Sequence, residues 1–189
     1  TWLRRQRQMC IRDSIDAVAS WWVNVHGHAN PYIQEKVSKQ LATLEHVIFA
    51  GFTHPWAVEL SERIVEMHPA NHKKVFFSDN GSTANEVAIK MALQYWWNQG
   101  KPKTKIIAFD NAYHGDTVGA MSIGGRGVFT TPFDDIMFDV EHIEVPNGTN
   151  NKEIIAQFKN IVATNEVAAF IYEPMVQGAG GMVMYDVDG

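Results

Sequence analysis

The sequence has very little cysteine: Cys10 is the single one among 189 residues. One cysteine forms neither an internal disulfide framework nor a cysteine-based metal site. A reducing compartment is the default for such a chain, so we expect a cytoplasmic protein. Long apolar runs are missing as well, and we therefore expect no transmembrane helix and no membrane partner.

The sequence also lacks a block of basic residues. Lys and Arg total 16 against 21 Asp and Glu, which gives a formal net charge of -5. A mildly acidic chain argues against nucleic acid as the main partner. Hydrophobic residues make up 46% of the chain, which is near the globular average and predicts a folded domain.

Residues 1–14 differ in composition from the rest of the chain. They contain Arg4, Arg5, Arg7, Arg12 and the only cysteine. The segment has no helical or strand period and lacks the apolar centre of a secretory signal. We expect it to be foreign or disordered and assign no function to it.

From residue 15 onward, helical and strand patterns alternate. Apolar residues at helical spacing predict helices over 33–45, after the turn at 51–55, over 82–98 and over 152–163. Short apolar runs predict strands at 74–78, 105–109, 142–145 and 167–172. This alternation predicts an α/β fold with βαβ units and a mainly parallel sheet.

The first motif that could carry chemistry is the hexapeptide at 78–83, between an expected strand and the helix at 82–98. Gly81 permits a tight turn, and Ser82 or Thr83 can cap the helix. Free N–H groups at a helix N-terminus form an anion site. The motif therefore predicts either a phosphate site or a helix cap without a ligand, and it does not match a P-loop.

Two further motifs follow the strands at 105–109 and 167–172. Ligands of open α/β sheets bind beyond the carboxyl ends of the strands. Tyr113 could stack on a flat heteroaromatic ligand there, or be a buried tyrosine beside a helix that Asp116 caps. Glu173 precedes a glycine-rich segment, 178–181, that allows close approach to a ligand. The alternative is a flexible crossover loop with a solvated Glu173.

The segment 20–28 contains two adjacent tryptophans, Trp21 and Trp22, and two histidines. Adjacent side chains project to different sides, so one tryptophan could line a substrate pocket while the other packs. His26 and His28 have no cysteine or carboxylate triad nearby, and we expect no metal site.

Taken together, these segments resemble the class III aminotransferases, which use pyridoxal 5'-phosphate. The resemblance is carried by residues 20–28, 44–54, 78–96, 113–122 and 173–182. The double tryptophan and the segments at 49–54 and 92–96 are narrower, and they resemble the branch of the family that acts in biotin biosynthesis. The resemblance covers the chain from about residue 20 to its last residue.

The resemblance implies a fold-type I PLP-dependent transferase large domain, mainly a parallel sheet flanked by helices, that is incomplete in this chain. Residues 15–50 would belong to the small domain, and residues 51–189 would be the N-terminal part of the cofactor-binding large domain. Members of the family are homodimers with active sites at the subunit interface. We expect the same of a longer parent chain.

The resemblance also implies roles for residues in two of the motifs. Ser82, with the N–H groups around Gly81 and Thr83, would bind the cofactor phosphate. Tyr113 would stack on the pyridine ring and shape the pocket of the amino substrate.

Five further residues receive roles from the same resemblance. His114 and Asp116 would support the ring site from behind. Glu173 would lie near the phenolic side of the cofactor. Trp21 and Trp22 would line the substrate entrance, where an aromatic face suits an aliphatic chain or an adenosyl group.

The implied reaction is a ping-pong transamination. S-adenosylmethionine gives its amino group, and 8-amino-7-oxononanoate receives it to form 7,8-diaminononanoate. No residue matches the Schiff-base lysine or the aspartate that pairs with the pyridine nitrogen, so no catalytic residue is assigned and this polypeptide is expected to be inactive alone. Two alternatives remain: another class III aminotransferase, acting on ornithine, 4-aminobutyrate or a β-amino acid, and a non-catalytic fragment that folds with a partner.

Overall fold

The computed structural model describes residues 15–185. These residues form parts of two compact units, whose boundary falls between Val75 and Phe76. The expectation for residues 1–14 lies outside the described residues. The expected division at 50/51 refers to the domains of a complete transferase fold, and it stays a prediction.

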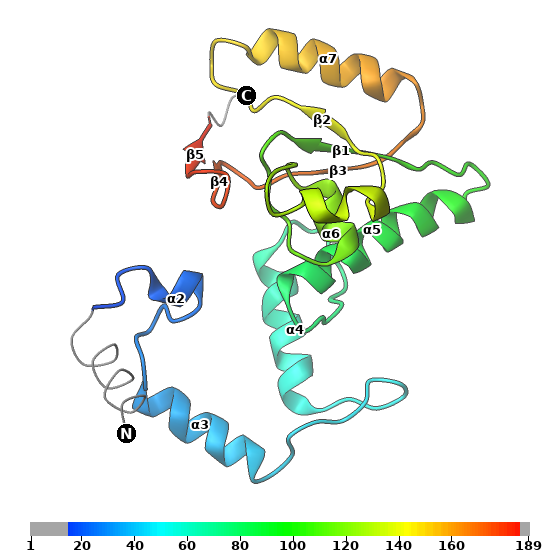
Figure 1. Cartoon of the computed structure of the whole chain (residues 1–189). Coiled ribbons are helices and arrows are strands. Elements are labelled where there is room, and N and C mark those ends of the chain that lie inside the picture. Colours follow the sequence, from blue (N-terminus) through cyan, green and yellow to red (C-terminus); the bar gives the residue numbers. More distant parts are fainter. Residues whose placement is uncertain (1–14, 186–189) are drawn as a thin grey trace. The chain divides into compact units, whose positions relative to one another are not determined.

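The first unit contains short helices: α2 (Ala19–Trp22), α3 (Pro31–Leu41) and α4 (Pro55–Met67) (Figure 1). Proline at the first turn suits α3 and α4, because the N–H that it lacks would have no helical partner there. The side chain of Asn30 caps α3, and that of His54 caps α4. The expected helix at 33–45 is therefore present but displaced toward the N-terminus, and the helix expected after 51–55 is confirmed.

The element α2 is a left-handed turn rather than an ordinary helix. Its residues Ala19, Ser20, Trp21 and Trp22 have φ values of 50, 46, 63 and 75°. For a residue with a Cβ atom, this conformation is less stable than the right-handed helical one by roughly 1–2 kcal/mol. The sequence contains no glycine in this turn to signal it.

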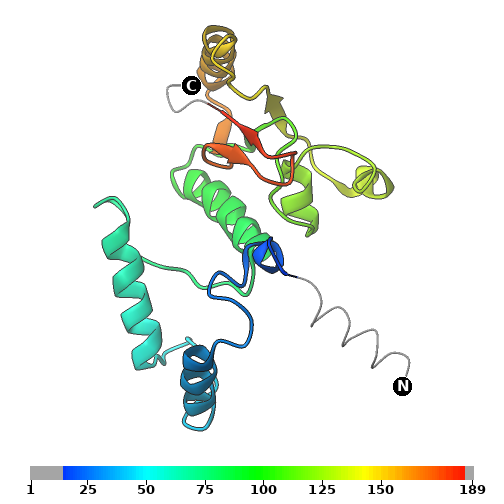
Figure 2. The same cartoon turned by 90° about the vertical axis from the view of Figure 1, so that its left-hand side faces the viewer.

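The second unit is an α/β layer structure. Its elements are α5 (Gly81–Asn98), β1 (Lys105–Phe109), α6 (Val118–Ile123), the 3₁₀ helix η1 (Thr131–Ile136), β2 (Glu141–Ile143), α7 (Asn151–Ala163), β3 (Val167–Ile171), β4 (Val176–Gln177) and β5 (Val183–Met184). The sheet has the order β2-β1-β3, and β1 is parallel to both neighbours. Strands β4 and β5 form a separate antiparallel pair (Figure 2). The expected parallel sheet is confirmed.

The two faces of β1 separate the core into two apolar clusters. Ile107 points to the α7 side, where it packs in a cluster with Ile154. Ile106, its neighbour in the strand, packs on the opposite face with Ile89 of α5 and Ile123 of α6. Figure 1 shows the same layering, with α7 on one side of the sheet and α5 and α6 on the other. A strand buried on both faces explains the uninterrupted apolar run of β1.

The prediction of a strand at 74–78 is wrong, because that segment has no strand structure. Both edges of β1 are taken by β2 and β3, so the segment has no place beside the central strand. Phe76 is 64% exposed, which is unlike a residue of a buried strand. Apolar composition alone therefore gave a false strand here.

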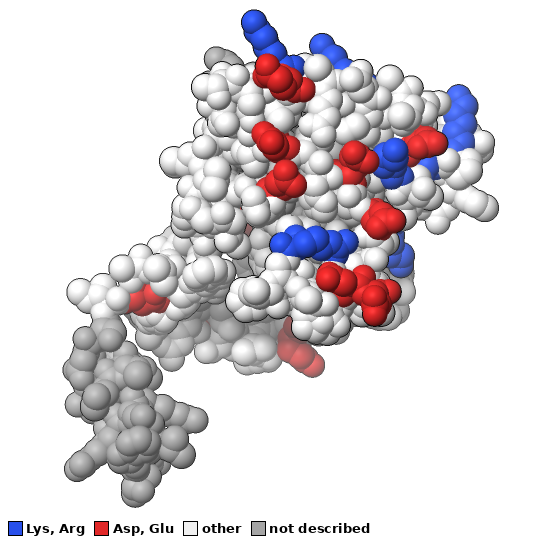
Figure 3. All heavy atoms as spheres, turned by 45° about the horizontal axis from the view of Figure 1, so that its top comes forward, with Lys and Arg blue, Asp and Glu red and all other residues white. Residues whose placement is uncertain are grey.

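The surface of the described residues mixes charges of both signs. On the face in Figure 3, acidic and basic side chains are interspersed. Within residues 15–185, no helix is long and apolar enough to cross a membrane.

Candidate functional site

The candidate site lies where three segments of the second unit meet: the loop after β1, the loop after β3 and the N-terminus of α5. Because β1 and β3 are parallel neighbours, their carboxyl ends lie at the same edge of the sheet. The N–H of Tyr113 donates to Glu173 Oε1 at 2.9 Å, and the N–H of Asp116 donates to Ser82 Oγ at 3.2 Å. The structure therefore brings together the three motifs of this unit that the sequence singled out.

The N-terminus of α5 is capped by Asn80. Asn80 Oδ1 accepts the N–H of Thr83 at 2.9 Å, and Thr83 Oγ1 accepts the N–H of Asn80 at 3.3 Å. The expectation that Ser82 or Thr83 caps the helix is thus corrected: Asn80 is the N-cap residue, and Thr83 completes the capping box. The N–H of Thr83 is engaged within the protein as a result.

Two N–H groups of the same turn keep their donor capacity. Within the described part of the chain, the N–H groups of Gly81 and Ser82 have no hydrogen-bond partner. A Cβ atom built on Gly81 would meet nothing within 4 Å, so there is open space beside the turn. Free donors at the positive end of a helix fit an anionic group such as a phosphate.

Ser82 adds a third donor. Its Oγ accepts the N–H of Asp116, which leaves the hydroxyl proton free to donate elsewhere. The backbone of the loop after β1 thereby determines where this hydroxyl lies.

Gly115 permits the close contact between this loop and α5. Its φ is 125°, and a Cβ atom there would lie 2.7 Å from the Cα of Ser82. No other residue fits without displacing the helix N-terminus, because the obstructing atom belongs to the backbone. Glycine at 115 is thus a requirement of the site's geometry.

The ring of Tyr113 is held by its hydroxyl. The phenol O–H donates to Asp116 Oδ2 at 2.8 Å, and the residue is 45% exposed. The hydrogen bond to Asp116, followed by burial and by the charge of that carboxylate, raises the pKa of Tyr113. The phenol therefore stays protonated and oriented, with part of the side chain accessible to a ligand.

His114 is turned into the protein, with 8% of its surface exposed. Its carbonyl accepts a hydrogen bond from Asn85 Nδ2 at 2.5 Å, which fixes the backbone to α5. Burial lowers the pKa of the imidazole, His142 adds to this, and Glu173 partly opposes it. Its Nε2 has no hydrogen-bond partner among the described residues, so the site contains an imidazole that favours the neutral form.

Glu173 bridges the two loops. Its Oε1 accepts the N–H of Tyr113, and its Oε2 accepts the N–H of Gly178 at 2.9 Å. The alternative of a solvated Glu173 on a free loop is therefore wrong. Gly180 has a packing role as well, since a Cβ atom there would lie 2.5 Å from the carbonyl oxygen of Asn111.

A small cavity of about 160 Å³ opens beside these residues. Tyr113, Asp116, Met121 and Phe129 are among the residues that line it. It combines an aromatic ring, a carboxylate and apolar surface, which suits a small ligand or one end of a larger one.

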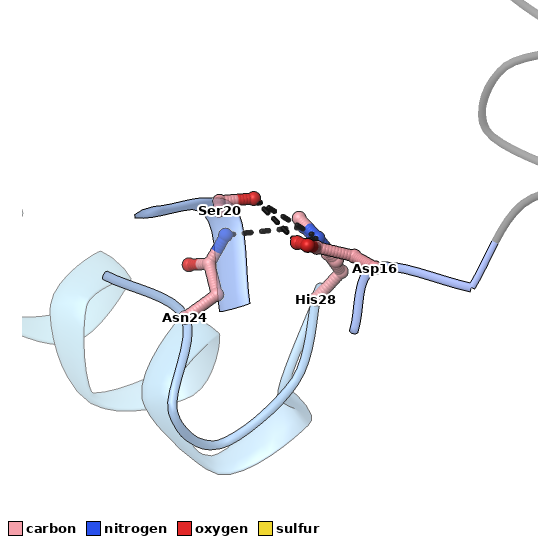
Figure 4. A network of polar contacts seen from close by, with 4 residues as sticks. All are labelled: Asp16, Ser20, Asn24 and His28. Atoms are coloured by element: carbon pink, nitrogen blue, oxygen red, sulfur yellow. Dashed lines mark hydrogen bonds and ion pairs between the residues drawn. The ribbon is translucent and has the colours of Figure 1, made fainter. Parts of the chain in front are cut away.

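The tryptophans of the sequence motif lie in the first unit, with Trp21 70% and Trp22 67% exposed. Polar side chains surround their turn: Asp16, Ser20 and His28 are in contact (Figure 4). Sequence analysis missed Asp16, because nothing in the pattern pairs it with a residue twelve positions away.

This polar group is not a nucleophile relay. In a Ser-His-Asp triad the two nitrogens of the imidazole contact serine and aspartate separately. Here His28 Nε2 faces both Asp16 and Ser20. No group of three histidine, cysteine or acidic residues within residues 15–185 could hold a metal ion.

Comparisons with a family model and with known sequences agree on one protein family. The family model "Aminotransferase class-III" matches residues 12–188. An adenosylmethionine-8-amino-7-oxononanoate aminotransferase of Synechococcus elongatus is 52% identical over 181 residues, covering 92% of this chain and 43% of that relative. The enzyme of the same name from Staphylococcus aureus is 40% identical over 186 residues, covering 90% of this chain and 41% of that relative.

Solved structures agree with the fold. The adenosylmethionine-8-amino-7-oxononanoate aminotransferase of Methanocaldococcus jannaschii has a TM-score of 0.83 and 35% identity, covering 91% of this chain and 39% of that one. A PLP-bound amine transaminase from an uncultivated Pseudomonas species has a TM-score of 0.84 and 31% identity, covering 92% and 43%. The expected fold-type I transferase architecture is confirmed, and this chain spans about two fifths of the length of these proteins.

Substitution of Gly115 by alanine tests the contact between the loop and α5. The added Cβ atom would collide with Ser82, so we expect the free energy of unfolding to fall by about 1–3 kcal/mol. Urea denaturation measures this. The control is Gly127→Ala, because a Cβ atom at Gly127 meets nothing within 4 Å. Equal losses at the two positions would contradict the close contact.

The titration of His114 tests its environment. Burial lowers its pKa, so NMR should show the imidazole titrating below the ordinary value of 6.5. Because the pKa is lower in the folded state, the unfolded chain takes up the proton first as the pH falls. The free energy of unfolding is therefore unaffected by this group above pH 6.5 and decreases as the pH falls from 6.5 through the folded pKa. His114→Gln assigns the resonance and removes this part of the acid sensitivity. A midpoint at or above 6.5 would disprove the buried neutral ring.

Proposed function

The chain belongs to the class III aminotransferase family, and from this we propose that the complete protein transfers an amino group from S-adenosylmethionine to 8-amino-7-oxononanoate. The product would be 7,8-diaminononanoate, in biotin biosynthesis. The observation that carries the proposal is the 52% identity, over 92% of this chain, to the Synechococcus enzyme of that name. Because the chain spans 43% of that relative, the activity is proposed for the complete protein.

Pyridoxal 5'-phosphate is the proposed cofactor, and the residues present fit its phosphate. The N–H groups of Gly81 and Ser82 and the Ser82 hydroxyl are available donors beside open space. The N–H of Thr83 is engaged by Asn80, so Thr83 would act through the capping box rather than by direct contact. A similar amine transaminase has been solved in a PLP-bound form.

When bound, the cofactor supplies the electron sink of amino-group transfer. The residues of this chain position the parts around it. Asp116 holds the hydroxyl of Tyr113, so the ring keeps a fixed orientation for stacking. Glu173 fixes the backbone at Tyr113 and the start of the glycine-rich loop. His114, a buried group whose pKa is lowered by burial, would support the ring site from behind.

Two further parts of the proposal rest on the resemblance to the family, and a third rests on the cysteine content. Trp21 and Trp22 would line the substrate entrance, where their rings suit an aliphatic or adenosyl group. The complete protein would be a homodimer. We place it in the cytoplasm, in keeping with a sequence that has one cysteine.

A second candidate is a transaminase with another donor. The structural similarity to an amine transaminase, with a TM-score of 0.84, favours considering it. The two candidates share cofactor chemistry and differ in the amino donor, so a donor assay separates them.

The donor assay uses the complete gene product with its cofactor. We expect 7,8-diaminononanoate to form from 8-amino-7-oxononanoate when S-adenosylmethionine is supplied, as measured by mass spectrometry. Glutamate, alanine and a simple primary amine are the comparison donors. Lysine is included as well, because its use as donor with the same acceptor, 8-amino-7-oxononanoate, would leave the proposed pathway intact. Turnover of other ketones with glutamate or an amine, and none of 8-amino-7-oxononanoate, would contradict the proposal.

Ser82→Ala tests the phosphate contact. Loss of a hydrogen bond to a charged group amounts to about 1.5–3 kcal/mol, so the Kd for pyridoxal 5'-phosphate should rise about ten- to a hundredfold. Cofactor absorbance during titration of the apoprotein measures it. Ser61→Ala is the matched control, since that hydroxyl donates to a carbonyl within α4. An unchanged Kd in Ser82→Ala would remove Ser82 from the phosphate site.

A further inference from the structure

The turn that carries Trp21 and Trp22 has an unfavourable backbone. All residues of α2 have positive φ, and none is glycine. The left-handed conformation is less stable than the right-handed one by roughly 1–2 kcal/mol for each such residue. A turn of this kind is stable only where surrounding contacts hold the backbone in place. Strained backbone conformations are also frequent at functional sites.

Four polar side chains supply these contacts, and Figure 4 shows them converging on one point. Ser20 Oγ donates to Asp16 Oδ2 at 2.6 Å, and His28 Nε2 lies 2.8 Å from the same oxygen. Asn24 Nδ2 lies 3.3 Å from His28 Nδ1. The group, here named the polar clamp, consists of Asp16, Ser20, Asn24 and His28.

One tautomer of His28 matches the contacts of the whole polar clamp. With the proton on Nε2, the ring would donate to Asp16 and accept from Asn24 through Nδ1. Hydrogen bonds from Ser20, and then from His28, lower the pKa of Asp16, so its side chain is a carboxylate. Every contact therefore has a donor and an acceptor.

The polar clamp spans the turn from both sides. Asp16 precedes α2, Ser20 lies within it, and Asn24 and His28 follow it. Backbone bonds close the turn as well, since the N–H groups of Val23 and Asn24 both donate to the carbonyl of Ala19. The chain is thus fixed before, within and after the two tryptophans, while their own side chains remain largely exposed.

We propose that the polar clamp is a positioning device: Asp16 and His28 hold the left-handed turn and thereby fix the direction in which Trp21 and Trp22 are presented to the substrate. The part about the substrate rests on the proposed function. The part about the turn does not, because it follows from the contacts of these four side chains. Asp16 and His28 act through the tryptophans and touch no reacting atom.

The test uses the complete protein labelled with 5-fluorotryptophan. Trp21→Phe and Trp22→Phe assign their ¹⁹F resonances. We expect His28→Ala and Asp16→Ala to shift and broaden both resonances. His28→Gln should largely restore them, because an amide can donate to Asp16 and accept from Asn24 in the same arrangement. His26→Ala is the matched control, a histidine of the same segment whose described contact is through its carbonyl.

Kinetics with S-adenosylmethionine and 8-amino-7-oxononanoate form the second arm. We expect His28→Ala to raise the KM of at least one of the two substrates about tenfold, which corresponds to the loss of about one hydrogen bond. The kcat should stay within about twofold of the unsubstituted protein. His28→Gln should recover KM. A general loss of structure would instead lower kcat and shift the resonances of every tryptophan.

The outcomes separate the two proposals. Unchanged ¹⁹F resonances of Trp21 and Trp22 in both alanine variants would overturn the polar clamp, whatever the enzyme's substrate. Shifted resonances with an unchanged KM would overturn its role toward the substrate. Absence of turnover in the unsubstituted protein would count against the proposed function alone, since the NMR arm needs no turnover.

Discussion

The carboxylate of Glu173 is the contact on which the rest of the candidate site depends. Its two oxygens accept backbone N–H groups from the loop after β1 and from its own loop after β3. Hydrogen bonds from N–H groups to an ionised carboxylate are stronger than those between neutral groups. The sheet brings the two loops to one edge, but this bridge sets how they lie against each other. The position of the Tyr113 backbone follows from it, while the hydroxyl of Tyr113 is held by Asp116.

The second constraint is the division of donors at the N-terminus of α5. A helix start leaves its first N–H groups without helical partners. Asn80 takes one of them, that of Thr83, and leaves those of Gly81 and Ser82 without a partner among the described residues. The capping box therefore stabilises the helix without closing the anion site. One turn of chain thus carries the helix cap and the donors proposed for the cofactor phosphate.

The elements with a long or clear period could be predicted from the sequence. The helix beginning near 82, the strand at 105–109 and the helix beginning near 152 are confirmed. The segment at 74–78 was misassigned because an apolar run does not reveal whether a pairing edge is available. The helix offered as the alternative at Asp116 is present as α6, but its N-cap residue is Thr117 and no side chain caps it. The 3₁₀ helix η1 and the β4–β5 pair were missed, since a few residues are too short to show a period.

The site was partly accessible to the same reasoning. Parallel topology placed Tyr113 and Glu173 at one edge, and both lie there. Asn80 could have been recognised as the cap, because asparagine ranks with serine at that position. The contact of Asp116 with Ser82 and that of Asp16 with His28 depend on backbone geometry, which no spacing in the sequence encodes.

The contact between Gly115 and Ser82 also bears on how this sequence can vary. A backbone atom of one segment occupies the space that a side chain at the other would need. The two positions are 33 residues apart in the chain, and any side chain at 115 demands a shift of the N-terminus of α5. Remodelling this corner of the site requires both loops to be redesigned at once.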